Sequence, residues 1–329
     1  MRNASDDQYL SEIREVDFTP VFILGVHRSG TSILYKTLSA TGCFNPVTAY
    51  HIIDYHELLR NYHQQVEESA RQKLTEMLRE QGLRDRKIDK MEVTADLAEE
   101  YGFLLNEQTI RMYLSSRNIA LFMEMCKKIQ FIAGNSKPLL LKNPYDFPNF
   151  LFMKQMFPSA KFIFIHRHPL KTISSTLKAF QVIFKDKHPY MAKLSRMYEK
   201  FYANPLLLLP FRIVFRFIPE LGVIYITMTT SNGARYYLKN IGKLPKKDYI
   251  AITYEEFCVH PQKTVEDIMH ALALKADKTV DAAGLMNPRK TDIDSTVQKL
   301  LPYISRSLRK YCEFFGYKIE KETQSSTQG

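Results

Sequence analysis

Residues 21–32 read VFILGVHRSGTS, a short apolar run that passes into a loop containing Gly25 and Gly30. The run at 21–26 has the length and continuity of a strand that is buried on both faces of a parallel sheet. The residues after the loop show helical periodicity up to Gly42, with one face formed by Ile33, Leu34, Thr37, Leu38 and Thr41. Strand, glycine-containing loop and helix in this order predict the first unit of an α/β fold.

Three later segments repeat this order of apolar strand and helix. They span residues 139–141 (LLL, running into Lys142), 162–165 (FIFI) and 249–254 (YIAITY). Strands that alternate with helices predict a parallel sheet covered on both faces. The expected fold class is therefore α/β, with a P-loop-like parallel sheet flanked by helices.

The helix after the strand at 162–165 is expected to begin at Pro169, because a proline at the first helical position leaves no donor unpaired. Its apolar stripe is expected to face the sheet and consists of Leu170, Ile173, Leu177 and Phe180. A last helix is expected at 295–315, ahead of a polar tail at 318–329.

A long insertion separates the first two core strands. Residues 54–133 are rich in Glu, Lys, Gln and Leu, which predicts several helices that break near Gly82 and Gly102. Two roles are open for this insertion, a lid or acceptor pocket and a purely structural cap, because composition does not separate them. We expect residues 1–329 to form one domain.

The chain of 329 residues has 46 Lys and Arg against 35 Asp and Glu, a formal net charge of +11. Such a surplus suits an anionic partner, whether a nucleotide, a nucleic acid or a membrane surface. The four cysteines lie far apart and form no metal-binding or disulfide pattern, at Cys43, Cys126, Cys258 and Cys312. This cysteine usage favours a reducing cytoplasm.

Residues 204–228, NPLLLLPFRIVFRFIPELGVIYITM, form the most apolar stretch of the chain. Arg212, Arg216 and Glu220 interrupt it, and a membrane-spanning helix needs roughly 20 predominantly apolar residues. We therefore expect a surface-lying or substrate-facing element, which leaves peripheral membrane contact open. The same stretch suggests an apolar or lipid-like acceptor.

The loop at 25–32 has the GxxxxG spacing of a phosphate-binding loop, but Thr31 stands where ATP-binding loops have lysine. An anion can still bind, because the backbone N–H groups of the loop and of the following first helical turn point at a common centre. Arg28 can clamp such an anion with two hydrogen bonds. The second strand delivers Lys142 rather than the Asp that would hold magnesium, so the loop does not suit Mg-ATP.

A second candidate anion site follows the strand at 162–165. Arg167 ends that strand, where ligands of open α/β sheets bind, and Ser175 lies on the next helix away from its apolar stripe. The pair can hold a second phosphate. Taken alone, a surface arginine and a solvated serine would be the simpler interpretation.

The two motifs, in this order, resemble those of the PAPS-dependent sulfotransferase superfamily, where PAPS is 3'-phosphoadenosine 5'-phosphosulfate. HRSGTS at 27–32 is similar to the PRSGTT loop of bacterial members and of protein-tyrosine sulfotransferases. The resemblance runs through residues 139–175 and includes EEYGFLL at 99–105 and YEEFCVHPQKTVEDIM at 254–269, with a looser match of NPRK at 287–290.

The resemblance implies PAPS as the donor and no metal. It implies that the 5'-phosphosulfate is bound by Arg28, Ser29, Gly30, Thr31 and Ser32. The 3'-phosphate would lie on Arg167 and Ser175 and the adenine near Tyr254, while Arg289 and Lys290 would close over the 3'-phosphate.

The resemblance also implies catalytic roles. Lys142 and Arg28 would stabilise the bridging oxygen as it gains charge. The general base stays open, because cytosolic members have a His two residues after the Lys, where this chain has Pro144. Protein-tyrosine sulfotransferases use a Glu after the first helix, and this chain offers four residues there: His51, Asp54, His56 and Glu57. We choose His51 as the nearest to the family position.

Two other functions compete with a sulfotransferase. A P-loop nucleotide kinase or NTPase would need the missing lysine and magnesium-binding aspartate. A non-catalytic basic protein on membranes or nucleic acid would bind with strong salt dependence and no nucleotide. The ordered strand–helix motifs make the second least favoured, and we expect a small-molecule or lipid-like acceptor rather than nucleic acid. The sequence does not predict an oligomeric state.

Overall fold

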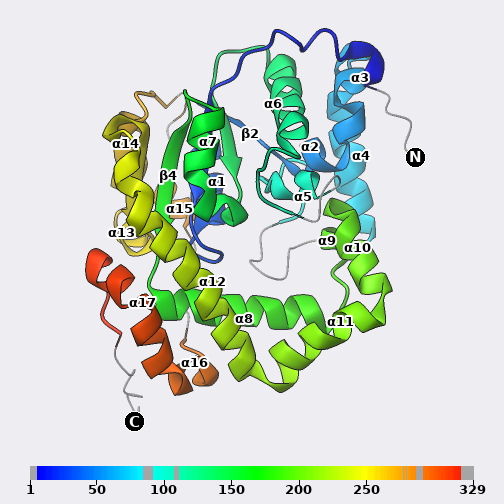
Figure 1. The fold of residues 1–329 in the computed structure, drawn as a ribbon. Coiled ribbons are helices and arrows are strands. Elements are labelled where there is room, and N and C mark those ends of the chain that lie inside the picture. The colour runs from blue at the N-terminus through cyan, green and yellow to red at the C-terminus, as the bar shows by residue number, and fades with distance from the viewer. Residues whose placement is uncertain are drawn as a thin grey trace.

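The computed structural model describes residues 6–83, 92–106, 111–276, 278, 280–286 and 292–319. It contains a five-stranded parallel sheet in the order β2-β3-β1-β4-β5 (Figure 1). The strands are β1 (Pro20–Leu24), β2 (Asn45–Pro46), β3 (Leu139–Lys142), β4 (Lys161–His166) and β5 (Tyr249–Thr253). The predicted α/β class and its four core strands are confirmed. The two-residue β2, which contains a proline, is too short to show any periodicity and was not predicted.

The register of the central strands aligns their carboxyl ends. Ile23 of β1 is paired with Lys142 of β3, and Leu24 of β1 with Phe164 of β4. The loop after β1, the end of β3 and the residues after β4 therefore meet at one edge of the sheet, where α/β proteins bind ligands.

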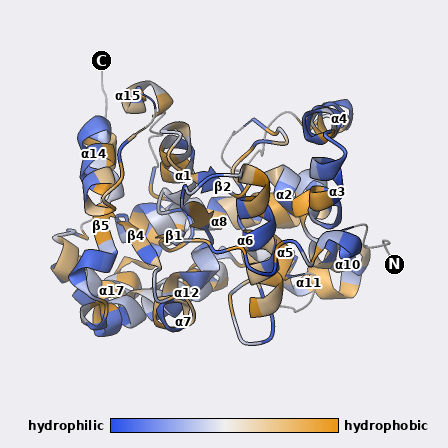
Figure 2. Cartoon of the chain, turned by 90° about the horizontal axis from the view of Figure 1, so that it is seen from above, coloured by the Kyte–Doolittle hydropathy of each residue, from blue (hydrophilic) through white to orange (hydrophobic). Residues whose placement is uncertain are grey.

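Alternate residues of β1 point to opposite faces, as the strand geometry requires. Phe22 and Leu24 pack with α6 (Ile119–Ala133) and α7 (Phe150–Met156). Val21 and Ile23 pack with α1 (Thr31–Ala40) and α14 (Pro261–Ala271). Figure 2 shows α1 and α14 on one side of the strands and α7 on the other. Both faces of the sheet are thus covered, which explains why every β1 residue is buried.

The segment between α1 and β3 contains helices of 4 to 15 residues rather than a regular bundle. They are α2 (Ala49–Ile53), α3 (Leu58–His63), α4 (Glu67–Glu80), α5 (Gly102–Leu105) and α6. Gly82, at φ +72°, follows the end of α4 as expected. Gly102 instead begins α5, and a Cβ there would lie 2.7 Å from Met112 O and 2.8 Å from Asn143 Oδ1. It permits a close approach to β3 rather than breaking a helix.

Helix α8 (Pro169–Lys185) begins at the predicted proline, but the predicted partner of its stripe was wrong. Leu170, Ile173 and Leu177 pack with α12 (Pro219–Asn240), α16 (Ser295–Lys299) and α17 (Leu301–Phe315), not against the sheet. Periodicity shows that a helix face is buried, but it does not show what covers it. Helix α8 crosses below the strands in Figure 1.

The predicted last helix is divided at Leu300 into α16 and α17, because Pro302 fits only the first turn of a new helix. Most of the predicted polar tail lies outside the described residues.

The remaining helices lie between α8 and α12 or around β5. They are α9 (Pro189–Leu194), α10 (Arg196–Ala203), α11 (Pro205–Arg212), the π-helical turn η4 (Ile213–Phe217), α13 (Tyr254–Val259) and α15 (Ala282–Leu285). Within the part of the chain that is described, we find no helix with the length and apolar character needed to cross a membrane.

A buried ion cluster ties the amino-terminal segment to the helices before β3. The Nζ of Lys128, on α6, lies 2.9 Å from Asp6 Oδ2 and 3.0 Å from Glu124 Oε1. Lys128→Ala would leave the buried Asp6 carboxylate without its cation, and we expect it to lower the free energy of unfolding by about 3–5 kcal/mol. Urea denaturation measures this loss. An equal loss in Lys36→Ala, at an exposed position on α1, would contradict the assignment.

Candidate active site

The loop between β1 and α1 is held in a compact conformation. Arg28 has φ +68° and Gly30 φ +103°, both in the left-handed region. A Cβ on Gly30 would lie 2.3 Å from Tyr254 Cδ2, so only glycine lets Tyr254 close on the loop. The hydroxyl of Ser29 is buried and makes no hydrogen bond within the described residues. A buried, unsatisfied hydroxyl beside the free N–H groups of a helix start fits an anionic ligand.

The structure brings Arg28, Arg167, Ser175 and Tyr254 together. The Nε of Arg28 donates to Ser175 Oγ at 3.1 Å, and Nη1 of Arg167 donates to the carbonyl oxygen of Arg28 at 2.9 Å. The Arg167 guanidinium lies over the Tyr254 ring, 4.3 Å from its centroid. Residues that are up to 226 positions apart in the sequence thus surround one end of the loop. Two guanidinium groups at this point favour an anion with two charged groups.

Lys142 ends β3 with its side chain fully buried. Its Nζ donates to Ser32 Oγ at 3.0 Å and lies 3.2 Å from Glu100 Oε1. A buried lysine needs such a partner because an isolated buried charge is costly. The pair places a carboxylate and an ammonium group directly beside the first turn of α1.

His27 of the loop contacts Tyr145, which lies in the turn after β3. Their rings meet edge to face with centroids 4.4 Å apart. Burial lowers the pKa of His27 below its usual value, and the positive charges of Arg28 and Lys142 lower it further, while Glu100 acts in the opposite direction. The lowered pKa favours the neutral imidazole, and the contact between His27 and Tyr145 was not anticipated from the sequence.

The structure gives His51 a different environment. Its Nδ1 lies 3.1 Å from the backbone N of Thr48, in the capping box of α2, and its Nε2 lies 3.3 Å from Arg71 Nη2. Burial and the Arg71 charge lower the pKa of His51 to about 3. Both ring nitrogens are engaged, and neither of these contacts is with the loop or with Lys142.

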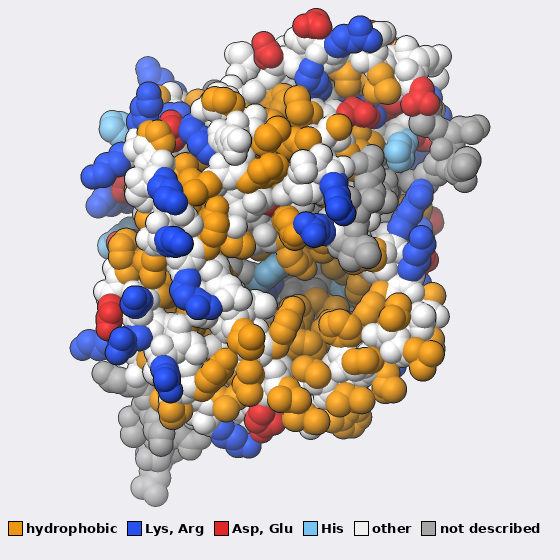
Figure 3. All heavy atoms as spheres, viewed as in Figure 1, with side chains coloured by type: hydrophobic (Ala, Val, Ile, Leu, Met, Phe, Trp, Pro, Cys, Tyr) orange, Lys and Arg blue, Asp and Glu red, His pale blue; other side chains and the backbone are white. Residues whose placement is uncertain are grey.

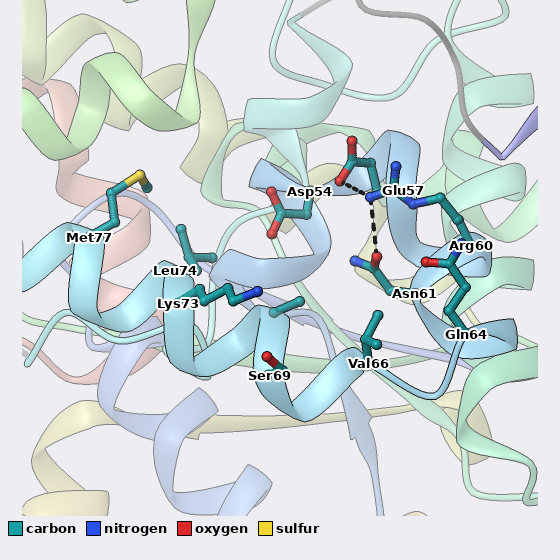
Figure 4. Close-up of a pocket in the computed structure, with 11 residues that line it drawn as sticks. Asp54, Glu57, Arg60, Asn61, Gln64, Val66, Ser69, Lys73, Leu74 and Met77 are labelled. Atoms are coloured by element: carbon teal, nitrogen blue, oxygen red, sulfur yellow. Dashed lines mark hydrogen bonds and ion pairs between the residues drawn. The ribbon is translucent and has the colours of Figure 1, made fainter.

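Two of the other base candidates, Asp54 and Glu57, line a separate pocket of about 490 Å³ (Figure 4). Glu57 is paired there with Arg60 at 2.7 Å, and the pocket wall comes from α3, α4 and the residues just before α3. No residue of the 25–32 loop lines it. His56 stacks edge to face on Tyr55. Arg289 and Lys290 lie outside the described residues.

Comparison with known proteins identifies the family of the chain. A family model described as "Sulfotransferase family" matches residues 20–214, more than half of the chain. The chain belongs to the sulfotransferase family. Among curated protein sequences none matches it significantly.

Two mycobacterial enzymes show the same fold as this sulfotransferase. Sulfotransferase STF9 from Mycobacterium avium is 13% identical, with a TM-score of 0.56 over 95% of this chain and 81% of that chain. Sulfotransferase STF1 from Mycobacterium tuberculosis H37Rv is 15% identical, with a TM-score of 0.57 over 93% of this chain and 80% of that chain.

The site of this sulfotransferase also contains a residue that the sequence analysis did not single out. Glu100 comes from EEYGFLL, a motif that was noted for its resemblance but given no role. The sequence signal for Glu100 was the presence of two adjacent acidic residues, Glu99 and Glu100, directly before an apolar segment. A carboxylate that is buried there needs a cation or a hydrogen-bond donor as its partner. In the structure Glu99 accepts from Tyr190 Oη at 2.8 Å, and Glu100 meets Lys142.

Proposed function

We propose that the protein transfers a sulfonate group from PAPS to a hydroxyl or amine of a small-molecule or lipid-like acceptor, without a metal ion. The observation that carries the proposal is the convergence of Arg28, Arg167, Ser175 and Tyr254 on one end of the loop, in a chain of the sulfotransferase family. Two anion sites joined by a hydrogen-bonded arginine pair suit a nucleotide that has phosphate groups on both its 3' and 5' positions.

The donor roles divide between the two ends of the loop. The N–H groups and hydroxyls from Ser29 to Ser32 would hold the 5'-phosphosulfate at the start of α1. Arg167 and Ser175 would hold the 3'-phosphate, and the ring of Tyr254 would pack near the adenine. Arg28 contacts Ser175 and also belongs to the loop, so it would touch both halves of the donor.

The chemical step would be an in-line displacement at sulfur. The acceptor oxygen forms a bond to sulfur, and the bond between sulfur and the bridging phosphate oxygen breaks with its electron pair. Lys142 and Arg28 would neutralise the charge that the bridging oxygen gains. Because a sulfonate carries less negative charge than a phosphoryl group, positioning and these two cations would suffice without a metal.

Glu100 is our choice for the general base in place of His51. It is the carboxylate beside Lys142, whereas His51 is held in a capping box with a pKa lowered to about 3. Glu100 would accept the proton of the acceptor hydroxyl as the bond to sulfur forms. With its Oε1 3.2 Å from Lys142 Nζ, the carboxylate would lie close to the transferred group, within reach of an acceptor hydroxyl that approaches the sulfur.

Calorimetric titration of adenosine 3',5'-bisphosphate tests the donor site without metal. Arg167→Ala is expected to weaken binding by about 10–100-fold, since it removes a charge-assisted contact to a phosphate. The control Arg309→Ala changes an arginine that is 74% exposed on α17, and binding should stay within about twofold. Binding of ATP with Mg²⁺ in place of the bisphosphate would favour the kinase alternative. Equal losses in both variants would refute the role of Arg167.

A further inference from the structure

The region from α11 through η4 to the middle of α12, residues 205–228, carries many exposed apolar side chains; we refer to it as the elbow. Helix α11 buries only Leu208, and Leu206 is 80% and Phe217 71% exposed. The exposed apolar members are Leu206, Leu207, Leu209, Phe211, Ile213, Phe217, Ile218, Leu221, Tyr225 and Met228. Figure 3 shows hydrophobic side chains gathered over this part of the molecule, beside a hollow. A contiguous patch of this kind marks an interaction surface.

We propose that the elbow docks on the surface of an anionic phospholipid bilayer, and that the acceptor is a lipid or lipid-soluble molecule taken from that bilayer. The second half of this statement rests on the proposed sulfotransfer. The first half concerns binding to the bilayer alone and is tested separately.

Helix α12 presents a face whose character changes along its length. Leu221, Tyr225 and Met228 follow each other at spacings of four and three residues, so they lie on one side of the helix. Continuing at the same spacing, Asn232 and Arg235 extend this side, and Met228 and Arg235 are about 10 Å apart along the axis. An apolar end followed by a cationic end matches the step from acyl chains to headgroups.

A second arginine stands at the cationic end. A pocket of about 440 Å³ joins α12 to α17 and is lined by Met228, Ser231, Asn232, Arg235, Tyr303, Arg306 and Ser307. Arg235 and Arg306 therefore share a concavity that begins at Met228, the last apolar residue of the elbow. Two arginines beside an apolar surface suit the phosphates of lipid headgroups.

The charge around the elbow favours an anionic bilayer over a second copy of the chain. Residues 185–220 contain seven basic and three acidic residues, a net charge of +4. Two of the acidic residues are already paired, Glu199 with Lys187 at 3.5 Å and Glu220 with Lys299 at 3.6 Å. A symmetric dimer would place two such faces against each other, and their like charges would repel. An anionic membrane neutralises them.

The elbow packs against α8, the helix that contains Ser175 of the candidate site. Tyr225 of the elbow is 53% exposed, and Tyr145, in the turn after β3, is 40% exposed. Tyr145 contacts His27 of the loop edge to face, with ring centroids 4.4 Å apart. Gly222 lets α12 approach Phe215 and Leu177, so the elbow and α8 form one packed unit.

Sedimentation with phosphatidylcholine vesicles, with and without phosphatidylglycerol, tests the docking. We expect the full chain to bind the anionic vesicles and to be released by salt. The double variant Leu206→Glu/Phe217→Glu should lower the vesicle partition coefficient by about tenfold or more. Docking would force both introduced carboxylates into the apolar layer of the bilayer, which is costly. These positions are so exposed that the substitutions do not disturb the core.

The matched control is Val259→Glu/Phe314→Glu, which changes two apolar residues that are 69% and 60% exposed outside the elbow. It carries the same added charge and should keep vesicle binding within about twofold. Failure of the wild type to bind anionic vesicles, or an equal loss in both double variants, would overturn the proposal. A dimer in analytical ultracentrifugation that only the elbow variant dissociates would instead make the elbow a subunit interface.

Binding of adenosine 3',5'-bisphosphate, measured on the same three proteins in the absence of vesicles, separates this proposal from the proposed function. If the wild type and both double variants bind the nucleotide, and only the elbow variant loses vesicle binding, the result supports both the docking surface and the proposed donor site. Vesicle binding without any nucleotide binding would leave the docking surface in place and refute the PAPS-dependent activity.

Discussion

Glu100→Gln is expected to lower kcat for sulfotransfer by about 10²–10⁴-fold, the usual contribution of a positioned general base. The amide keeps the size of the side chain and can still accept a hydrogen bond from Lys142, but it cannot take the proton of the acceptor. The affinity for adenosine 3',5'-bisphosphate should stay within about twofold, because no donor contact is assigned to Glu100. Steady-state kinetics with saturating PAPS and calorimetry give the two readouts.

Glu57→Gln is the matched control, since it makes the same substitution in the separate pocket of Figure 4. Its kcat should stay close to that of the wild type. A large loss of kcat in Glu57→Gln with little change in Glu100→Gln would assign the general base to the segment after α1 instead of to Glu100. If both retain activity while His27→Asn does not, the neutral His27 imidazole beside Glu100 is the base.

Lys142→Met is expected to lower kcat by about 10²–10³-fold, as removal of one preorganised charge at a developing oxyanion does. Methionine fills nearly the same buried volume, so the loss should come from the missing charge rather than from a cavity. Lys142 is fully buried and is paired with Glu100 at 3.2 Å. Replacing Lys142 removes a buried cation from beside that carboxylate, so thermal unfolding has to be measured alongside the kinetics.

Lys154→Met supplies the comparison for Lys142. Lys154 is also paired with a carboxylate, Asp248, at 2.9 Å, but it belongs to α7, outside the candidate site. A shift in melting temperature without a comparable loss of kcat is expected there. Should both variants lose activity only in proportion to their stability, Lys142 would be a structural residue. In the double variant Glu100→Gln/Lys142→Met the losses should be smaller than additive, because the two groups act on one step.

The strands and the phosphate-type loop could be predicted from the sequence because their signals are local. A continuous apolar run such as 21–26 predicts a strand that is buried on both faces. The left-handed position at φ +103° is occupied by Gly30, the residue type that adopts it most readily. The spacing of eight residues between Arg167 and Ser175 is likewise a property of one strand end and one helix. The family relation then followed from the order of the motifs.

Other features depend on which segments meet, and local patterns do not contain that information. The stripe of α8 is visible in the sequence, but its partners α12, α16 and α17 come from residues at least 34 positions further along. His51 stands in the expected segment, yet the turn that begins α2 uses its ring as a cap.

The sequence by itself therefore determined the α/β class and the four core strands, because each depends on periodicity within a short segment. The resemblance of its motifs to the sulfotransferase family indicated the residues that are proposed to hold the donor. Only the tertiary structure decided that Glu100 meets Lys142, that His51 does not, and that residues 205–228 turn their apolar side chains outward. The reason is physical: a carboxylate is matched to its cation, and an apolar face to its cover, by contacts between distant segments that form only when the chain has folded.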